Sequence, residues 1–273
     1  MPRPRANRLR TNPLRTTGRR RTAAATALCA ALIVPLAAGC GGSGDEASGG
    51  GEKTTIKVLA AASLTDVFKK AGAEYEKAHP GTIVKFSYAG SQQLAAQVKQ
   101  DFPADALVTA DTRTMDGLKG QTGTPVTIAH NRLVIAAGKG NPKKIENLKD
   151  LTDSKLKVVL AAPEVPVGRY SRQVLDRQHL KVKPVSQEQD VRGVLSKVEL
   201  GEADAGIVYA TDAKTAPGKV DAVSVPDEQN AVAAYPAATL KVSEHKKQAD
   251  SFVTWLRSAK AQQILREAGF QKP

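Results

Sequence analysis

Short apolar segments alternate with amphipathic segments after residue 54, and this alternation constrains the fold more than any other feature of the sequence. Residues 56–60 form a short apolar run that is typical of a buried strand. The apolar residues after it recur at helical spacing until His79, and a second strand-like run begins at Thr82. A chain with this pattern is predicted to form βαβ units, from which α/β folds are built.

The same reasoning applies to most of the chain from 54 to 273. Strands are expected at 56–60, 82–88, 106–108, 132–137, 156–161 and 206–209, and helices at about 64–75, 92–100, 171–177 and 244–268. About 220 residues are enough for two small lobes. We therefore expect an α/β protein with two lobes, each a mainly parallel sheet flanked by helices, and a ligand cleft between them.

The first 40 residues have the pattern of a lipoprotein signal peptide. Eight arginines and no acidic residue accompany an apolar segment at 23–38, which is too short to span a membrane comfortably. Small residues then lead to Cys40 in the run LAAGC. We expect a signal peptide at 1–39, exported by the general secretory or the twin-arginine route, and a lipid on Cys40. The alternative is a membrane-anchoring helix that is never cleaved.

This leader changes the interpretation of the charge and of the cysteines. Without the eight arginines of 1–39 the formal net charge falls from +13 to +5, which removes the main support for nucleic-acid binding. Cys29 leaves with the signal peptide and Cys40 is acylated, so the mature protein has no disulfide and no thiolate site. The Gly- and Ser-rich residues 40–53 are expected to form a flexible tether to the outer face of the cell membrane.

Two serines stand where a predicted strand becomes a predicted helix. Ser63 follows the first strand in the run AAASL, and Ser91 follows the second in YAGSQ. In a parallel sheet both turns open at the carboxyl edge, so the two hydroxyls and nearby amides would meet at one small ligand such as an oxyanion. The alternative for each serine alone is a plain helix N-cap.

Several short motifs make 54–273 resemble the molybdate-binding proteins of ABC importers. These motifs are AAASL at 60–64, GS at 90–91 with Leu94, PAD at 103–105, PVG at 166–168 with Tyr170, DVR at 190–192, GIVY at 206–209 with Thr211 and Asp212, and YP at 235–236. The resemblance implies a two-lobed solute-binding protein of the type II periplasmic-binding class. It also implies that serine hydroxyls, main-chain amides and one tyrosine hydroxyl hold the oxyanion, namely those of Ser63, Ser91, Val167, Val191 and Tyr209.

The resemblance also implies a role and partners. The protein would bind molybdate, and tungstate as well, and deliver it to a membrane permease with ATPase subunits, as a monomer and without a cofactor or a free-cation site. Lobe 1 is expected at 54–130 plus 231–273, and lobe 2 at 131–230. The region 228–234 would be part of the hinge.

Two positions depart from the family pattern and bear on selectivity. Val167 stands where many members have alanine, and Gln92 follows Ser91 where a small residue is common. A pocket lined by neutral donors disfavours a protonated anion such as hydrogen phosphate. Sulfate is the alternative ligand, which only the size of the cavity would exclude. Molybdate and tungstate are nearly the same size, and the sequence does not separate them.

Other side chains near these motifs have plainer interpretations. Tyr209 is alternatively a core tyrosine with its hydroxyl at the surface, and Tyr170 is the second candidate phenol. Arg169 and Arg192 are expected to be solvated and not to bind the anion.

Three acidic residues are expected to serve local structure. Asp105 and Asp111 fit loop and turn positions, because no second acid or histidine stands at metal-ligand spacing. Asp66 fits the first turn of the helix after Ser63, where a negative charge suits the helix dipole.

Two further classes of protein serve as alternatives. A secreted serine hydrolase would need a histidine to reach Ser63 or Ser91, yet neither serine lies in GxSxG or SxxK. The four histidines form no HExxH or paired-ligand pattern. A structural lipoprotein would have no pocket. We therefore do not expect an enzyme.

Overall fold

A computed structural model describes residues 53–273. The predicted signal peptide, Cys40 and the tether up to residue 52 lie outside the described residues. Between residues 53 and 273, no helix combines the length and the apolar composition that crossing a membrane requires.

The first group of elements is built on three parallel strands, in the order β2-β1-β3. The strands are β1 (Thr54–Ala61), β2 (Thr82–Ala89) and β3 (Ala106–Val108). Its helical elements are η1 (Ala62–Leu64), α1 (Thr65–Ala78), α2 (Ser91–Lys99), α3 (Thr112–Asp116), α7 (Lys246–Trp255) and α8 (Ala259–Glu267). Aromatic rings of α1, β2 and α7 pack together in its core, with Phe68 and Tyr75 both edge-on to Phe252.

The second group is built on the parallel strands β7-β5-β6. The strands are β5 (Val158–Ala161), β6 (Ser186–Glu188) and β7 (Ala205–Tyr209), with β8 (Val220–Ser224) on the other edge of β4. Its helical elements are η2 (Leu148–Thr152), α4 (Pro166–Arg177), α5 (Val191–Glu199) and α6 (Ala210–Lys214).

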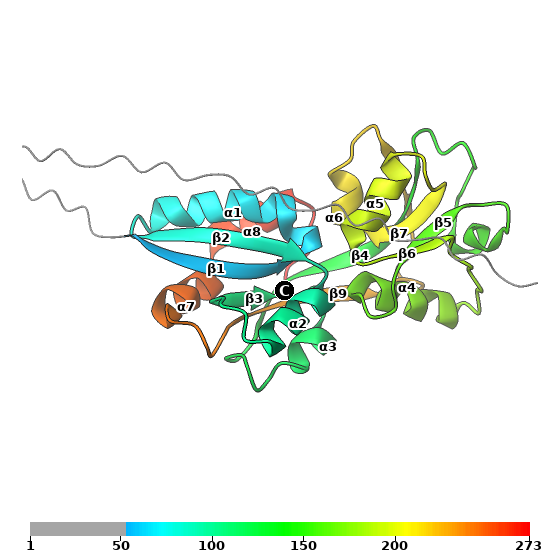
Figure 1. Ribbon diagram of the computed structural model, residues 1–273. Helices are drawn as coiled ribbons and strands as arrows, with labels where there is room; N and C mark the ends of the chain where they lie inside the picture. Colours follow the sequence, from blue (N-terminus) through cyan, green and yellow to red (C-terminus); the bar gives the residue numbers. More distant parts are fainter. Residues whose placement is uncertain (1–52) are drawn as a thin grey trace, which may run out of the picture. The chain divides into compact units, whose positions relative to one another are not determined.

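Two long strands connect the groups, as Figure 1 shows. In β4 (Val126–Gly138), residues 126–132 pair with β9 (Val232–Thr239), whereas residues from Leu133 onward pair with β7 and β8. The predicted two-lobed α/β fold is therefore confirmed. The sheets are less parallel than expected, because every pairing of β4 and β9 is antiparallel.

Some element boundaries differ from the prediction. The single helix expected at 244–268 is two helices, because the chain turns after α7 and Ser258 starts α8 by accepting a hydrogen bond from the Ala261 N–H at 3.3 Å. The helix expected at 171–177 begins five residues earlier, at Pro166, whose fixed φ suits the first helical position. Helix α5 was not predicted.

Candidate functional site

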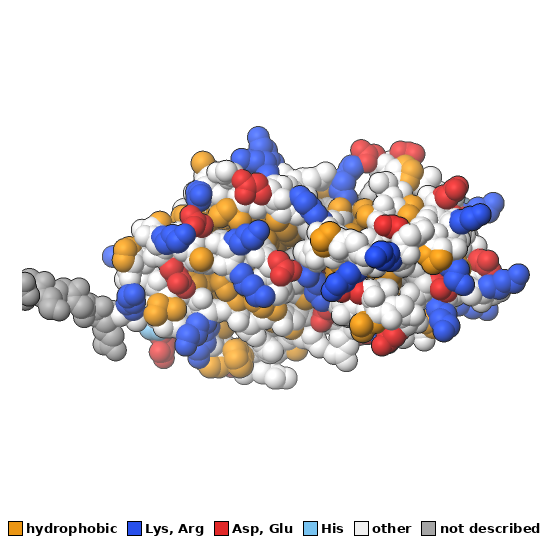
Figure 2. Space-filling view, turned by 90° about the horizontal axis from the view of Figure 1, so that it is seen from above, with side chains coloured by type: hydrophobic (Ala, Val, Ile, Leu, Met, Phe, Trp, Pro, Cys, Tyr) orange, Lys and Arg blue, Asp and Glu red, His pale blue; other side chains and the backbone are white. Residues whose placement is uncertain are grey.

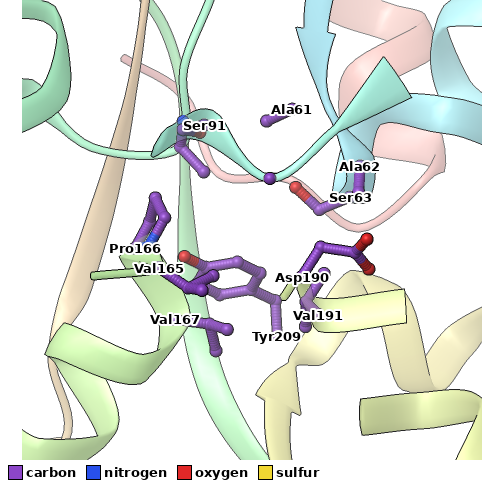
Figure 3. Close-up of a pocket in the computed structure, with 12 residues that line it drawn as sticks. Ala61, Ala62, Ser63, Ser91, Val165, Pro166, Val167, Asp190, Val191 and Tyr209 are labelled. Atoms are coloured by element: carbon purple, nitrogen blue, oxygen red, sulfur yellow. Dashed lines mark hydrogen bonds between the residues drawn. The ribbon is translucent and has the colours of Figure 1, made fainter. Parts of the chain in front are cut away.

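A small pocket lies between the two groups of elements, with a cavity volume of about 10 Å³ (Figure 3). It is smaller than the cavities that hold drug-sized organic ligands. All five residues that the resemblance implied line it, and so do several small or apolar neighbours: Ala61, Ala62, Gly90, Ala110, Val165, Pro166 and Asp190. Four of the five lie at the carboxyl end of a strand or within three residues after it, and Val167 lies six residues after β5. Their role as ligands stays a prediction.

Ser63 enters the pocket from the short 3₁₀ turn η1, directly after β1. Its side chain is buried, and its hydroxyl lies 2.9 Å from the hydroxyl of Tyr235. The cap of this turn is Ala61, with no side-chain capping hydrogen bond. The alternative of a plain helix N-cap is therefore wrong for Ser63.

Ser91 is the first residue of α2 and is also buried. The N-cap is Gly90, whose N–H donates to the side chain of Gln93. The Ser91 hydroxyl oxygen instead accepts a hydrogen bond from the N–H of Ala110 at 3.0 Å. The N-cap alternative is wrong here too, because the oxygen is held by a neighbouring strand end and the hydroxyl hydrogen is left available.

The N-termini of α4 and α5 present main-chain amides at the other side of the pocket. Val165 caps α4 without a side-chain hydrogen bond, so the first amides of this helix, including that of Val167, have no cap. In α5, Asp190 accepts from the N–H groups of Arg192 and Gly193 at 2.8 and 3.0 Å. The sequence motif contained Asp190, but its capping role was not predicted.

Tyr209 ends β7 at the floor of the pocket, with its ring opposite the two serines in Figure 3. Its hydroxyl is buried and has no hydrogen-bond partner among residues 53–273. Burial is the main cause that raises the pKa of Tyr209 well above its usual value, so the phenol keeps its proton. The alternative that Tyr209 is a core tyrosine with its hydroxyl at the surface is therefore wrong.

Tyr170, the second candidate phenol, does not line this pocket. It lines a separate cavity between α4 and the start of α3, together with Asp111 and Arg169. Burial raises its pKa to about 12.

The expectation that Arg169 and Arg192 are solvated is wrong. Neither lines the small pocket, and both are held in ion pairs. Arg169 of α4 donates from Nε to Asp111 Oδ2 at 2.9 Å and from Nη2 to Thr114 Oγ1 at 2.8 Å. These contacts join a helix of the second group to the start of α3 in the first. The residues are too far apart in the sequence for the pairing to have been predicted.

Arg192 of α5 forms a second connection between the groups. Its Nη1 lies 2.8 Å from Asp66 Oδ2 on α1, and its Nε lies 2.8 Å from Asp212 Oδ1. The second contact lacks hydrogen-bond geometry. Asp66 does lie in the first turn of α1, as predicted.

Asp111 has the local role that was predicted, whereas Asp105 joins distant parts of the chain. Asp111 caps α3 by accepting from the Thr114 N–H at 3.0 Å. Asp105 accepts from the Lys57 N–H at 2.7 Å and from the Ser243 hydroxyl at 2.6 Å.

Gln92 also contributes to the contact between the two groups. Its side-chain amide donates to the main-chain oxygen of Gln189 at 2.7 Å, and the Gln93 amide donates to Gln189 Oε1 at 2.5 Å. Gln92, the residue that departs from the family pattern, therefore helps to hold the two groups together and does not bind the anion through its side-chain amide.

The described part of the chain offers little support for a metal-dependent enzyme or a serine hydrolase. No cluster of three or more potential metal ligands occurs among residues 53–273. The hydroxyl of Ser63 faces Tyr235 and that of Ser91 faces the Ala110 amide, so neither has a histidine partner there. On the face seen in Figure 2, acidic and basic side chains are interspersed, unlike the continuous basic surface of a nucleic-acid-binding protein.

Two α/β lobes, joined by crossing strands and with a small pocket between them, are the architecture of a solute-binding protein. A model of the bacterial extracellular solute-binding proteins matches residues 56–271, and the chain belongs to this family. It is 38% identical over 254 residues to the molybdate-binding protein ModA of Mycobacterium tuberculosis, which covers 91% of this chain and 97% of that protein.

Solved structures show the same fold. The Azotobacter vinelandii periplasmic molybdate-binding protein matches with a TM-score of 0.70 and 23% identity, over 80% of this chain and 99% of that one. The sulfate-binding protein SubI of Mycobacterium tuberculosis matches with a TM-score of 0.70 and 20% identity, over 80% of this chain and 87% of that one. At these sequence identities, the two structures support the fold and not the ligand.

Proposed function

We propose that this protein binds molybdate, and tungstate as well, outside the cytoplasmic membrane and delivers it to an ABC permease. The observation that carries the proposal is the buried hydroxyl of Tyr209, which has no partner among the described residues and lies in the pocket with Ser63 and Ser91. An unpaired buried hydroxyl costs free energy, and a bound oxyanion would remove that cost. The name of the 38% identical relative supports molybdate as the oxyanion.

The lining suits a doubly charged anion that carries no proton. No lysine or arginine lines the pocket, so the donors are neutral hydroxyls and main-chain amides. Helix N-termini at α2, α4 and α5 add partial positive charge. The one acid in the lining, Asp190, accepts both hydrogen bonds from its own helix through a single oxygen, Oδ1.

Sulfate is the second candidate ligand. Like molybdate, it is tetrahedral and carries no proton at neutral pH, so the same donors would accept it. The fold is shared with a sulfate-binding protein, so sulfate stays an alternative ligand. The two anions differ in size, and the cavity must therefore decide between them.

The remaining parts of the proposal rest mainly on the sequence. Cys40 carries a lipid that anchors the protein at the outer face of the membrane, and the protein acts as a monomer with a permease and its ATPase subunits as partners. Lobe 1 comprises 54–130 and 231–273, and lobe 2 comprises 131–230. The change of partner along β4 at Leu133 supports this division.

Thermal unfolding in the presence of anions tests the ligand. Residues 41–273 contain both groups of elements and are the protein to use. A ligand at a hundred times its Kd should add about 2.7 kcal/mol, or roughly 5 to 11 °C in Tm at this size. We expect this shift with molybdate and tungstate. An equal shift with sulfate would change the substrate, and no shift with any anion would overturn the proposal.

A single substitution tests the site. Tyr209→Phe removes a hydroxyl that has no partner in the free protein, so the Tm without ligand should stay the same or rise. Molybdate affinity should fall about 10- to 100-fold, because a hydrogen bond to a charged ligand is lost. Tyr88→Phe is the matched control, since its hydroxyl is also buried and without a partner but lies outside the pocket. Unchanged affinity in Tyr209→Phe would remove this residue from the site.

A further inference from the structure

The direction of each serine hydroxyl decides what kind of anion the pocket accepts. A hydroxyl can donate one hydrogen bond and can also accept. A serine held as a donor favours an anion that has no proton of its own, whereas a serine free to accept would tolerate an anion with one. The contacts behind the two serines therefore bear on selectivity.

The direction of Ser91 is settled by one neighbour. The main-chain N–H of Ala110 donates to Ser91 Oγ at 3.0 Å, and a main-chain N–H cannot accept. The hydroxyl oxygen is thereby engaged, and its hydrogen is left for the pocket.

Ser63 has a neighbour that could act either way. Its Oγ lies 2.9 Å from the hydroxyl oxygen of Tyr235, and either group could donate. Behind Tyr235 stands Asn131, whose Nδ2 lies 3.4 Å from the tyrosine oxygen and 2.7 Å from Thr211 Oγ1. Asn131 and Tyr235 are buried.

The orientation of the Asn131 amide resolves the ambiguity. Its Oδ1 accepts from the main-chain N–H of Arg132 at 3.0 Å, so its NH₂ group faces Tyr235 and Thr211. An NH₂ group only donates, and the tyrosine oxygen therefore accepts from Asn131. The tyrosine hydrogen then points to Ser63, the one remaining hydrogen-bond neighbour of this hydroxyl among the described residues.

The opposite direction would be costly. If Ser63 donated to Tyr235, the tyrosine hydrogen would be buried without an acceptor, which costs the desolvation of that group. Tyr235 does not avoid this cost by losing its proton, because burial raises the pKa of Tyr235 far above its usual value.

We propose that Asn131 and Tyr235 are positioning residues that hold the Ser63 hydroxyl as a hydrogen-bond donor towards the pocket and so make it select oxyanions without a proton. This inference rests on the proposed oxyanion function. Asn131 lies on β4 and Tyr235 on β9, the two strands that connect the lobes. The chain of donors thus starts at the crossing strands and ends at the ligand.

The test compares the affinities of molybdate and of phosphate, which carries at least one proton at neutral pH, in residues 41–273. Tyr235→Phe removes the donor to Ser63 and keeps the ring that packs edge-on against Tyr209 and Phe270. Molybdate affinity should fall about three- to tenfold, the worth of one hydrogen bond. Phosphate affinity, measured by competition, should hold or rise, because Ser63 becomes free to accept. The molybdate-to-phosphate ratio should narrow by at least the same factor.

Two further variants make the result decisive. Asn131→Ala removes the donor to the Tyr235 oxygen and should also narrow the molybdate-to-phosphate affinity ratio. This second variant keeps the inference testable if Tyr235→Phe folds poorly. Tyr88→Phe is the control and should leave both affinities unchanged. An equal loss of affinity for both anions, or an unchanged ratio in both variants, would overturn the inference while leaving oxyanion binding intact. A wild-type protein that binds neither molybdate nor sulfate would instead overturn the proposed function.

Discussion

Asp212 shows how far a single residue can depart from its usual chemistry in this fold. Its side chain is fully buried at the start of α6. Burial raises its pKa from 3.8 to about 6, and the nearby Arg192 offsets only part of this effect. The folded protein therefore holds the proton of this carboxyl more tightly than the unfolded chain does.

This pKa predicts a pH dependence of stability with a definite sign. The contribution of Asp212 is fully present below about pH 4 and is lost as the pH rises to about 6, because ionising the buried group opposes folding. The loss is at most about 3 kcal/mol. Urea unfolding of the wild type and of Asp212→Asn between pH 4 and 7 checks this. The wild type should lose stability relative to the variant, and parallel curves would contradict the assignment.

At the scale of elements, the site depends on how closely α4 approaches β5. A Cβ atom on Gly168 would lie 2.1 Å from the main-chain oxygen of Ala162 and 2.6 Å from that of Ala161. Only glycine allows the first turn of α4 to pack here, and that turn carries the Val167 amide into the pocket.

Gly168→Ala should therefore displace the start of α4. We expect a loss of about 1 to 3 kcal/mol in the free energy of unfolding, since the contact is with backbone that cannot rotate away. Molybdate affinity should fall as well, measured by calorimetry under conditions where the variant is folded. Gly81→Ala is the control, because nothing lies within 4 Å of its added Cβ. Wild-type stability and affinity in Gly168→Ala would show that α4 has room to adjust.

At the scale of the whole described body, several polar contacts join the lobes. Arg169 pairs with Asp111, Arg192 pairs with Asp66, and Gln92 donates to the main chain of Gln189. Asp111 is only 4% exposed, so its ion pair is shielded from solvent. These contacts stabilise the present arrangement of the lobes, on which the proposed binding of a ligand between them would depend.

Arg169→Leu should shift the population towards an open arrangement. A loss of about 1.4 kcal/mol of closure free energy would weaken molybdate binding about tenfold, although Arg169 does not line the pocket. Small-angle X-ray scattering without ligand should show a larger radius of gyration than the wild type has. Arg172→Leu, an exposed arginine on the same helix, is the control for lost charge. An unchanged affinity together with an unchanged radius would argue against a closing role.

Much of the fold could be read from the sequence, because it depends on local periodicity. The strands before Ser63 and Ser91 and the helices after them follow from apolar spacing and from stop signals, and both serines lie where those patterns placed them. The helix expected at 244–268 failed for a local reason, since Ser258 begins a new helix inside a continuous amphipathic pattern. The family motifs also selected five residues that line one pocket.

The sequence by itself determined the α/β class, the two lobes and five of the residues that line the pocket, because strand and helix periodicity and short motifs are local signals. Only the tertiary structure decided the partners of those residues. Tyr235 lies 172 positions from Ser63, and Asp111 lies 58 positions from Arg169. Such pairs have no signature in sequence spacing. The antiparallel strands that join the lobes bring them together, and burial then sets the direction of their hydrogen bonds.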